Sequence, residues 1–202
     1  MKRLVIIGAS GHGKVVADIA KKTGYEQIVF LDDRDSLSAC GGYTVAGKCC
    51  CFKDYDCDIV VAIGNPLIRE KFLTELENNG KRIPILVHPG AVIGENVEIG
   101  AGTVVAAGAV VNPGTVIGKG CIINTCASVD HDCMVADYVH VSVGAHVAGT
   151  VNIGERTWIG AGATVSNNIC ICANTMIGAG AVVVKDIREA GTYVGVPARI
   201  RK

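Results

Sequence analysis

The stretch IGENVEIGAGTVVAAGAVVNPGTVIGKGCIINTCAS, residues 93–128, repeats every six residues. An Ile or Val opens each hexapeptide, and this pattern continues in phase without exception from Ile93 to Val183. The position four residues later carries only small or β-branched side chains, beginning with Val97, Thr103 and Ala109. Neither the period of a helix nor that of a strand sustains a repeat of six, whereas short strands joined by tight corners do. The sequence therefore predicts a hexapeptide β-solenoid over residues 91–187.

The composition favours small-molecule ligands or self-association. The 202 residues include 19 Lys plus Arg and 19 Asp plus Glu, so no net field attracts nucleic acid or an anionic membrane surface. Aromatic residues make up only 4% of the chain while glycines number 26, as expected for a core of stacked Ile and Val ladders with glycine at the corners.

The ten cysteines form no CxxC pair, although Cys49, Cys50 and Cys51 are consecutive. Cys121 and Cys133 fall on the small inward position of the repeat, where a thiol packs as a compact apolar group. We therefore expect reduced, structural cysteines. The N-terminal apolar run is too short for a signal peptide and no segment is long enough to span a membrane, so we expect a cytoplasmic protein.

An α/β pattern precedes the repeat. Apolar strands and amphipathic helices alternate, with expected strands at 3–7, 27–31, 58–63 and 82–87, a glycine-rich turn at 8–13, and helices at 14–23 and 67–79. This order predicts a Rossmann-like βαβ domain over residues 1–87, with a parallel sheet. The solenoid domain then occupies residues 88–202, and a short helix at 185–190 is expected to help cap its end.

The glycine-rich turn suggests a nucleotide site. Its glycines, Gly8, Gly11 and Gly13, do not have the G-x-G-x-x-G spacing, but backbone N–H groups at the start of the next helix still suit a phosphate. Asp32 and Asp33 follow the second strand, where a Rossmann-like unit places its ribose acceptor. The alternative is that the glycines only form a tight turn and the aspartates cap a loop.

Histidines and carboxylates gather in one window of the repeat, namely Asp130, His131, Asp132, His140 and His146. His131 lies two places after an inward Val, at a corner, so it should face outward. One coil takes 18 residues, which puts Gly149 beside the imidazole and leaves room there. Neighbouring carboxylates should raise the pKa of His131, which suits a general base. A plain surface histidine is the alternative; a shared zinc site is disfavoured by the uneven spacing, and no metal is expected.

Several motifs together resemble a known family: GASGHG at 8–13 (with Ala9), LDD at 31–33, AIGN at 62–65 with Ile68 and Arg69, NTCASVDHD at 124–132, HVSVGAHVAG at 140–149 and GVPAR at 195–199. The chain resembles the bacterial nucleotide-sugar acetyltransferases of the left-handed β-helix superfamily, especially the UDP-4-amino-sugar N-acetyltransferases of N,N′-diacetylbacillosamine biosynthesis. The sialic acid O-acetyltransferases are the next most similar. The resemblance covers the entire chain and implies a left-handed coil and a homotrimer with acetyl-CoA between neighbouring subunits.

The resemblance also implies residue roles. His131 would be the general base, supported by Asp132 where the family usually has Glu, or by Asp130. Contact with acetyl-CoA is implied for His140, Gly149, Ala161 and Ala179, and contact with the UDP-sugar for Ser10, Gly11, His12, Asp32, Asp33, Gly64 and Asn65. No role follows for His146.

Three functions stay open at this point. The first is direct acetyl transfer from acetyl-CoA to the 4-amino group of a UDP-4-amino-4,6-dideoxy-N-acetyl-hexosamine, without a metal. The second is O-acetylation of sialic acid or another sugar. The third is a non-catalytic trimeric scaffold that binds a nucleotide sugar.

Overall fold

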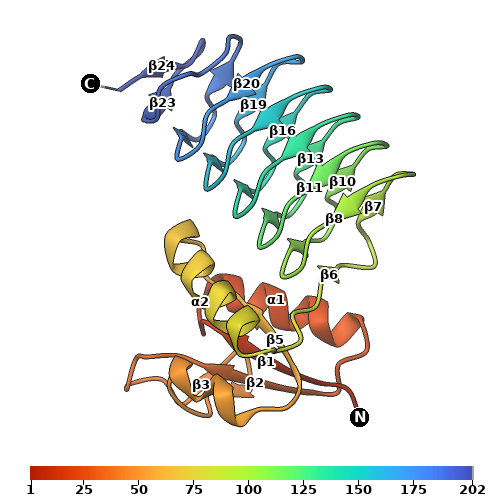
Figure 1. Cartoon of the computed structure of the whole chain (residues 1–202), viewed down its shortest axis with the longest axis vertical. Helices are drawn as coiled ribbons and strands as arrows, with labels where there is room; N and C mark the ends of the chain where they lie inside the picture. The colour runs from red at the N-terminus through yellow and green to blue at the C-terminus, as the bar shows by residue number, and fades with distance from the viewer. Residues whose placement is uncertain (202) are drawn as a thin grey trace.

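The computed structural model describes residues 1–201 and consists of an α/β part with a β-solenoid stacked on it (Figure 1). The α/β part contains a parallel sheet in the order β2-β1-β5. Its helices are α1 (Gly11–Lys22) and α2 (Pro66–Asn78), and its strands are β1 (Arg3–Ile7), β2 (Gln27–Leu31) and β5 (Asp58–Val61). A small hairpin and a 3₁₀ helix complete it: β3 (Ala39–Cys40), β4 (Tyr43–Thr44) and η1 (Cys49–Asp54).

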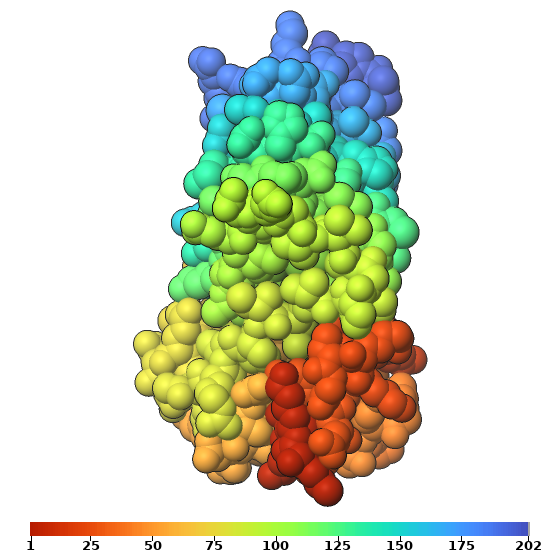
Figure 2. Space-filling model, turned by 90° about the vertical axis from the view of Figure 1, so that its right-hand side faces the viewer, coloured from red at the N-terminus to blue at the C-terminus, as the bar shows by residue number. Residues whose placement is uncertain are grey.

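The two faces of this sheet carry separate apolar clusters. Leu4 and Ile6 of β1 pack against α1, whereas Val5 and Ile7 pack against α2 and η1, because successive side chains of a strand point to opposite faces. Both clusters continue into the solenoid, the first through Val104 and the second through Tyr138. The chain is therefore one continuous elongated body, with the α/β part at its base (Figure 2).

The solenoid is built from three sheets, parallel except for the terminal pair of strands in the chain, and we name each sheet by one of its strands. Its strands are short, and pairing of Val111 with Val129 and of Val129 with Val147 gives the coil of 18 residues. The β13 sheet contains β7 (Val92–Ile93), β10 (Val110–Val111), β13 (Ser128–Val129), β16 (His146–Val147), β19 (Thr164–Val165) and β22 (Val182–Val183). The β14 sheet contains β8 (Glu98–Ile99), β11 (Val116–Ile117), β14 (Met134–Val135), β17 (Asn152–Ile153) and β20 (Cys170–Ile171). The β15 sheet contains β6 (Leu86–Val87), β9 (Val104–Val105), β12 (Ile122–Ile123), β15 (His140–Val141), β18 (Trp158–Ile159), β21 (Met176–Ile177), β23 (Thr192–Val194) and β24 (Arg199–Ile200).

The predicted repeat positions form the solenoid core. From Val105 to Val183 the Ile and Val ladder is buried, and so are small side chains such as Ala109, Cys121 and Cys133. Inward threonines remain satisfied, because Thr103 and Thr115 donate hydrogen bonds to backbone carbonyls of the same corner one coil later. The expected solenoid after an α/β region is confirmed.

Helix α2 lies against one corner of the solenoid, between the β14 and β15 sheets. Leu73 of α2 fits beside Gly102 and Gly120, where an added Cβ would approach its methyl carbons to 2.8 and 2.5 Å. Glycine at these two corner positions therefore allows the close approach of the helix. Ion pairs from Glu70 and Glu77 of α2 to neighbouring corners of the solenoid flank this contact.

Three details differ from the expectation. Helix α1 begins at Gly11 rather than residue 14, because Ser10 is its N-cap and accepts a hydrogen bond from the backbone N–H of Gly13. Only Leu86–Val87 of the strand expected at 82–87 forms, and it joins the solenoid by pairing with β9. No helix forms at 185–190; a bridge from Ile187 to Ile171 and the strands β23 and β24 cap the end instead. Within residues 1–201, no helix has the length and apolar character of a membrane span.

Candidate active site

His131 occupies the solenoid corner between the β13 and β14 sheets. It follows the inward Val129 by two residues, and its side chain is 55% exposed. The outward orientation predicted from the repeat is therefore what the structure shows. An imidazole in this position is accessible to a ligand lying along the corner.

Asp132 holds the imidazole of His131. Its Oδ2 atom lies 2.9 Å from Nδ1 of His131. Asp130 has a different function, because its Oδ1 accepts hydrogen bonds from the backbone N–H of His131 and from the side chain of Asn112. The shorter Asp side chain therefore reaches the imidazole although the family pattern has Glu, and Asp130 orders the backbone of the same corner.

The hydrogen bond to Asp132 has two consequences for His131. It raises the pKa of the imidazole, and the negative charges of Asp130 and Asp132 add to this effect. It also favours the tautomer with the proton on Nδ1, which leaves Nε2 with a free lone pair. Nε2 is thus the atom that can accept a proton from a substrate.

Gly149 forms a notch next to this nitrogen, as the 18-residue coil predicts. An added Cβ at Gly149 would lie 2.5 Å from Nε2 and 2.6 Å from Cε1 of His131. The backbone N–H of Gly149 donates no hydrogen bond within residues 1–201. The notch therefore combines the free nitrogen of His131 with a free backbone donor.

We expect Gly149→Ala to reduce turnover by roughly 10²-fold, because the methyl group displaces the imidazole by a large fraction of an ångström or more. The backbone at Gly149 is not in the left-handed region, so alanine can adopt the same conformation and the substitution acts through the added Cβ. Steady-state kinetics and a melting curve test this. Asn167→Ala, one coil later in the same corner column, is the control and should keep wild-type turnover. Equal turnover of Gly149→Ala and Asn167→Ala would contradict the requirement for open space at Gly149.

The expected nucleotide residues meet at one edge of the α/β sheet. The glycine-rich turn follows β1, Asp32 and Asp33 follow β2, and Gly64 and Asn65 follow β5, so all lie at the carboxyl ends of adjacent parallel strands. This edge is where open α/β sheets bind ligands. Gly11 and Ser10 are exposed there at the start of α1.

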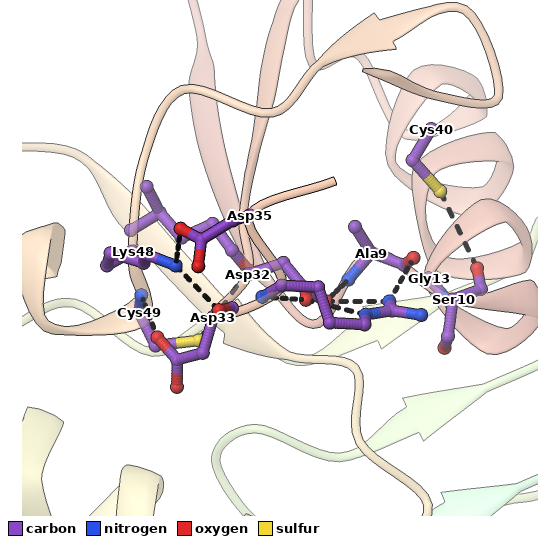
Figure 3. A network of polar contacts seen from close by, with 11 residues as sticks. Ala9, Ser10, Gly13, Asp32, Asp33, Asp35, Cys40, Lys48 and Cys49 are labelled. Carbon is purple, nitrogen blue, oxygen red and sulfur yellow. Dashed lines mark hydrogen bonds and ion pairs between the residues drawn. The ribbon is translucent and has the colours of Figure 1, made fainter. Parts of the chain in front are cut away.

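Asp32 has no free acceptor position, which differs from the expected role as a ribose acceptor. Its Oδ1 accepts from the backbone and Nε of Arg34, and its Oδ2 accepts from Nη2 of Arg34 and the backbone N–H of Ala9. These bonds hold the pKa of the Asp32 carboxyl far below its usual range. Figure 3 shows the network, with Ala9 and Ser10 on one side of Asp32 and with Asp33 and Cys49 on the other.

Asp33 and Asn65 are partly engaged. Oδ1 of Asp33 accepts from the backbone N–H of Cys49 at 2.9 Å, which leaves the other carboxylate oxygen for a ligand. The side chain of Asn65 caps α2 by accepting from the backbone N–H of Ile68 at 3.1 Å. Gly64 accepts a hydrogen bond from Arg69 through its carbonyl.

A second histidine site lies where the α/β part meets the β15 sheet. His140 is buried, its Nε2 is 3.0 Å from the side-chain nitrogen of Asn124, and its ring lies 4.5 Å from the Trp158 ring, centroid to centroid. Burial lowers the pKa of His140 to about 3, and burial with the nearby charge of Arg69 lowers that of His12 to about 4. Both histidines are therefore neutral at physiological pH.

Each of these two histidines has one buried nitrogen without a hydrogen-bond partner among the described residues, Nε2 in His12 and Nδ1 in His140. Such orphaned atoms are costly unless a ligand or water completes them. The loop of Gly64 borders the same region, because an added Cβ there would lie 3.7 Å from Trp158. His12, His140 and Gly64 thus surround one polar region at the junction of the two parts.

The structure separates His131 from this junction. In a triangular cross-section, the corner between the β13 and β14 sheets lies opposite the face formed by the β15 sheet, which carries His140. Ala161 and Ala179 are exposed and stacked one coil apart at a third place, the corner between the β15 and β13 sheets. The predicted residues therefore form three groups on one chain, and His146 lies apart from them with its Nδ1 2.8 Å from Ser128 Oγ.

Two residues without a predicted role stand out in the structure. Arg69 is fully buried and binds four backbone carbonyls across the junction, and Arg34 holds Asp32. No spacing rule marks either one, because the partners of Arg69 are backbone carbonyls and the pair of Arg34 with Asp32 depends on its side-chain conformation. Within the part of the chain that the structure describes, no three His, Cys, Asp or Glu side chains cluster as metal ligands would.

Comparison with known proteins adds independent support. Residues 3–76 match the family model of the PglD N-terminal domain. The acetyltransferase domain of PglB from Neisseria gonorrhoeae FA1090, solved in complex with acetyl coenzyme A, is 42% identical, covers 99% of each chain and has a TM-score of 0.96. PerB from Caulobacter crescentus, solved in complex with CoA and GDP-perosamine, is 34% identical, covers 100% of this chain and 98% of that chain, and has a TM-score of 0.95. The UDP-N-acetylbacillosamine N-acetyltransferase of Bacillus subtilis (strain 168) is 34% identical over 110 residues, 52% of this chain and 51% of the relative.

The solenoid with its α/β part defines a class of enzyme, the hexapeptide-repeat acetyltransferases that use acetyl-CoA as acetyl donor. Full-length similarity then assigns the family. The chain belongs to the bacterial sugar N-acetyltransferases of the hexapeptide-repeat superfamily.

Proposed function

We propose that the protein acetylates the 4-amino group of a UDP-4-amino-4,6-dideoxy-N-acetyl-hexosamine, with His131 as general base. The observation that carries this proposal is the His131–Asp132 pair, 2.9 Å apart, with Nε2 free beside Gly149. Nε2 removes the proton of the amine as the amine nitrogen attacks the thioester carbonyl of acetyl-CoA. The carbon–sulfur bond then breaks, and CoA leaves as a thiolate or, with the proton, as a thiol.

The tetrahedral oxyanion formed in this step requires a donor close to the base. The backbone N–H of Gly149 is our candidate, because it has no other hydrogen-bond partner within residues 1–201 and adjoins His131. This arrangement needs neither a metal ion nor a covalent intermediate on the enzyme. Asp132 keeps the Nδ1 tautomer in place throughout the reaction.

The active site is completed by a second copy of the chain. The edge of the α/β sheet where the expected nucleotide residues meet, which we call the nucleotide edge, borders the β15 sheet of the solenoid. His131 lies on the corner of the solenoid opposite that sheet. A homotrimer, in which His131 of one subunit meets the junction at His140 of the next, joins the two halves. The β14 sheet beside His131 also carries an apolar groove of about 720 Å³ that includes half-exposed Met134, which a neighbouring subunit would cover.

In this assembly acetyl-CoA binds in a groove that forms between neighbouring subunits. His140 and Gly149 lie toward the thioester, and the exposed column of Ala161 and Ala179 lines the pantetheine and nucleotide portions. Small side chains suit this purpose because they leave a smooth surface along the corner. Ser10, Gly11, His12, Asp33 and Gly64 lie at the sheet edge assigned to the UDP-sugar.

Asp132→Asn tests the base. Because the hydrogen bond to Asp132 raises the pKa of His131, its loss should lower that pKa, so the acidic limb of the kcat/KM profile should move to lower pH. The plateau rate should also fall, by at least about tenfold, since the tautomer is no longer fixed. Asp132→Glu retains the carboxylate and should keep the limb near its wild-type position. An acidic limb at the wild-type pH in Asp132→Asn would contradict the effect of the Asp132 hydrogen bond on the pKa of His131.

Mass spectrometry of products tests the substrate. Purified protein with acetyl-CoA and a panel of UDP- and GDP-linked 4-amino sugars should acetylate the UDP-linked 4-amino sugar fastest. The corresponding 4-hydroxy sugars and sialic acid should remain unmodified. Faster acetylation of the GDP-linked sugar would overturn the choice of nucleotide, and acetylation of hydroxyl groups alone would overturn the choice of acceptor.

A further inference from the structure

The nucleotide edge carries an excess of negative charge near the end of β2. Asp32, Asp33 and Asp35 are close together in sequence, and a nucleoside diphosphate would add more negative charge to this edge. Lys48 cannot neutralise the ligand while its Nζ is bound to the carbonyl of Asp33 and paired with the Asp35 carboxylate. A diphosphate at this edge therefore needs another cation.

Arg34 provides that cation in a fixed position. Its Nε and Nη2 form a two-point pair with the carboxylate of Asp32, at 2.8 and 2.9 Å. Nη2 also donates to the carbonyl of Ala9, at 2.8 Å, which ties the guanidinium to the glycine-rich turn. Nη1 makes no hydrogen bond to residues 1–201, and the side chain is 56% exposed. Its two free N–H groups are therefore available to a ligand.

The start of α1 adds backbone donors two and three residues beyond Ala9. Ser10 is the N-cap, and the first turn of α1 contains no acidic residue. The N–H groups of Gly11 and His12 have no partner in the helix, as at every helix start. Gly11 is exposed, and an added Cβ there would meet nothing within 4 Å, so the start of α1 is open to a ligand on this side. The guanidinium is bound to the carbonyl of Ala9, so it lies at the same turn from which these backbone donors start.

We propose that Arg34 binds the diphosphate of the nucleotide-sugar substrate through Nη1, with Asp32 as the residue that positions it. This inference rests on the proposed function and refines it, because Asp32 then orients an arginine rather than accepting a ribose hydroxyl. A diphosphate fits better than a base here, since a single free nitrogen beside helix N–H groups matches phosphate oxygens.

Arg34→Ala should weaken UDP binding by roughly ten- to hundredfold in isothermal titration calorimetry, as expected for loss of a charge-assisted contact. The KM for the nucleotide sugar should rise by a similar factor, while kcat stays within about twofold, because Arg34 does not touch the reacting atoms. Arg34→Lys keeps the charge but loses the two-point pair, so it should lie between wild type and Arg34→Ala. The salt dependence of UDP binding should also become weaker in Arg34→Ala.

Arg82→Ala is the matched control. Arg82 is also exposed and also pairs with two carboxylates, those of Asp56 and Asp58, but at the start of β5 and thus at the opposite edge of the sheet. The UDP affinity of Arg82→Ala and its KM for the nucleotide sugar should equal those of the wild type. Equal UDP affinity for Arg34→Ala and wild type would overturn the role of Arg34 while leaving the proposed function in place. If wild-type protein bound neither UDP nor GDP, the proposed function and this inference would both be overturned.

Discussion

Replacement of His131 by alanine should lower kcat/KM by roughly 10²- to 10⁴-fold, the usual contribution of a positioned general base. The loss arises because the imidazole is the group that borders the Gly149 notch, so its removal takes away the acceptor for the proton of the amine. The side chain is exposed and its polar contact is with the neighbouring Asp132, so the fold should be preserved. The melting temperature should stay within about 2 °C of the wild type. Steady-state kinetics with acetyl-CoA and calorimetric melting measure both effects.

His146→Ala is the matched control for this variant. His146 is likewise an exposed histidine of the solenoid, with a single side-chain contact to Ser128. Its removal should change neither turnover nor stability. Turnover of His131→Ala close to that of His146→Ala would exclude His131 as the base.

Replacement of Arg69 by methionine should destabilise the protein by about 3 kcal/mol or more, with a fall in melting temperature of about 6–12 °C. Arg69 is fully buried and donates hydrogen bonds of 2.6 to 2.8 Å to the carbonyls of Ile63, Gly64, Gly120 and Tyr138. Methionine fills much of the volume but leaves these carbonyls without donors in a buried place. Acetyl transfer should fall as well, because Arg69 fixes the loop of Gly64 against the solenoid.

Arg156→Met provides the comparison for Arg69. Arg156 also joins α2 to the solenoid, through an ion pair with Glu70 at 3.1 Å, but it is partly exposed. Its loss should cost at most about 1 kcal/mol and less than about 4 °C. A melting temperature of Arg69→Met as high as that of Arg156→Met would show that the buried hydrogen bonds at the junction are not what holds the two parts together.

The solenoid and the corner of His131 could be predicted because a hexapeptide repeat is a local rule. Each residue has a fixed place in the coil, so the outward direction of His131 and the neighbouring position of Gly149, 18 residues later, follow from counting alone. The structure confirms the buried ladder and places Gly149 against the imidazole. The carboxylate of Asp132 could also be placed near His131, although its reach to Nδ1 required coordinates.

Other features depend on contacts that the repeat does not encode. The carboxylate of Asp32 has no free acceptor position because of the conformation of Arg34. Arg69 joins the two parts of the molecule by binding carbonyls far away in the sequence. The end of the solenoid closes with β23 and β24 rather than a helix, because pairing with β21 satisfies the exposed strand edge. The separation of His131 from His140 also appears only when the coil is closed into a prism.

The most direct test of the shared active site is a mixing experiment with two inactive variants. His131→Ala removes the base, and Gly11→Asp places a carboxylate in the open space before α1, where it should repel a diphosphate without disturbing the helix. Each variant alone should be inactive. Unfolded and refolded together in equal amounts, they should recover roughly a quarter of wild-type activity, because a site needs the intact α/β part of one chain and His131 of another. Mixed oligomers with no activity above that of the separate variants would contradict a site shared between subunits.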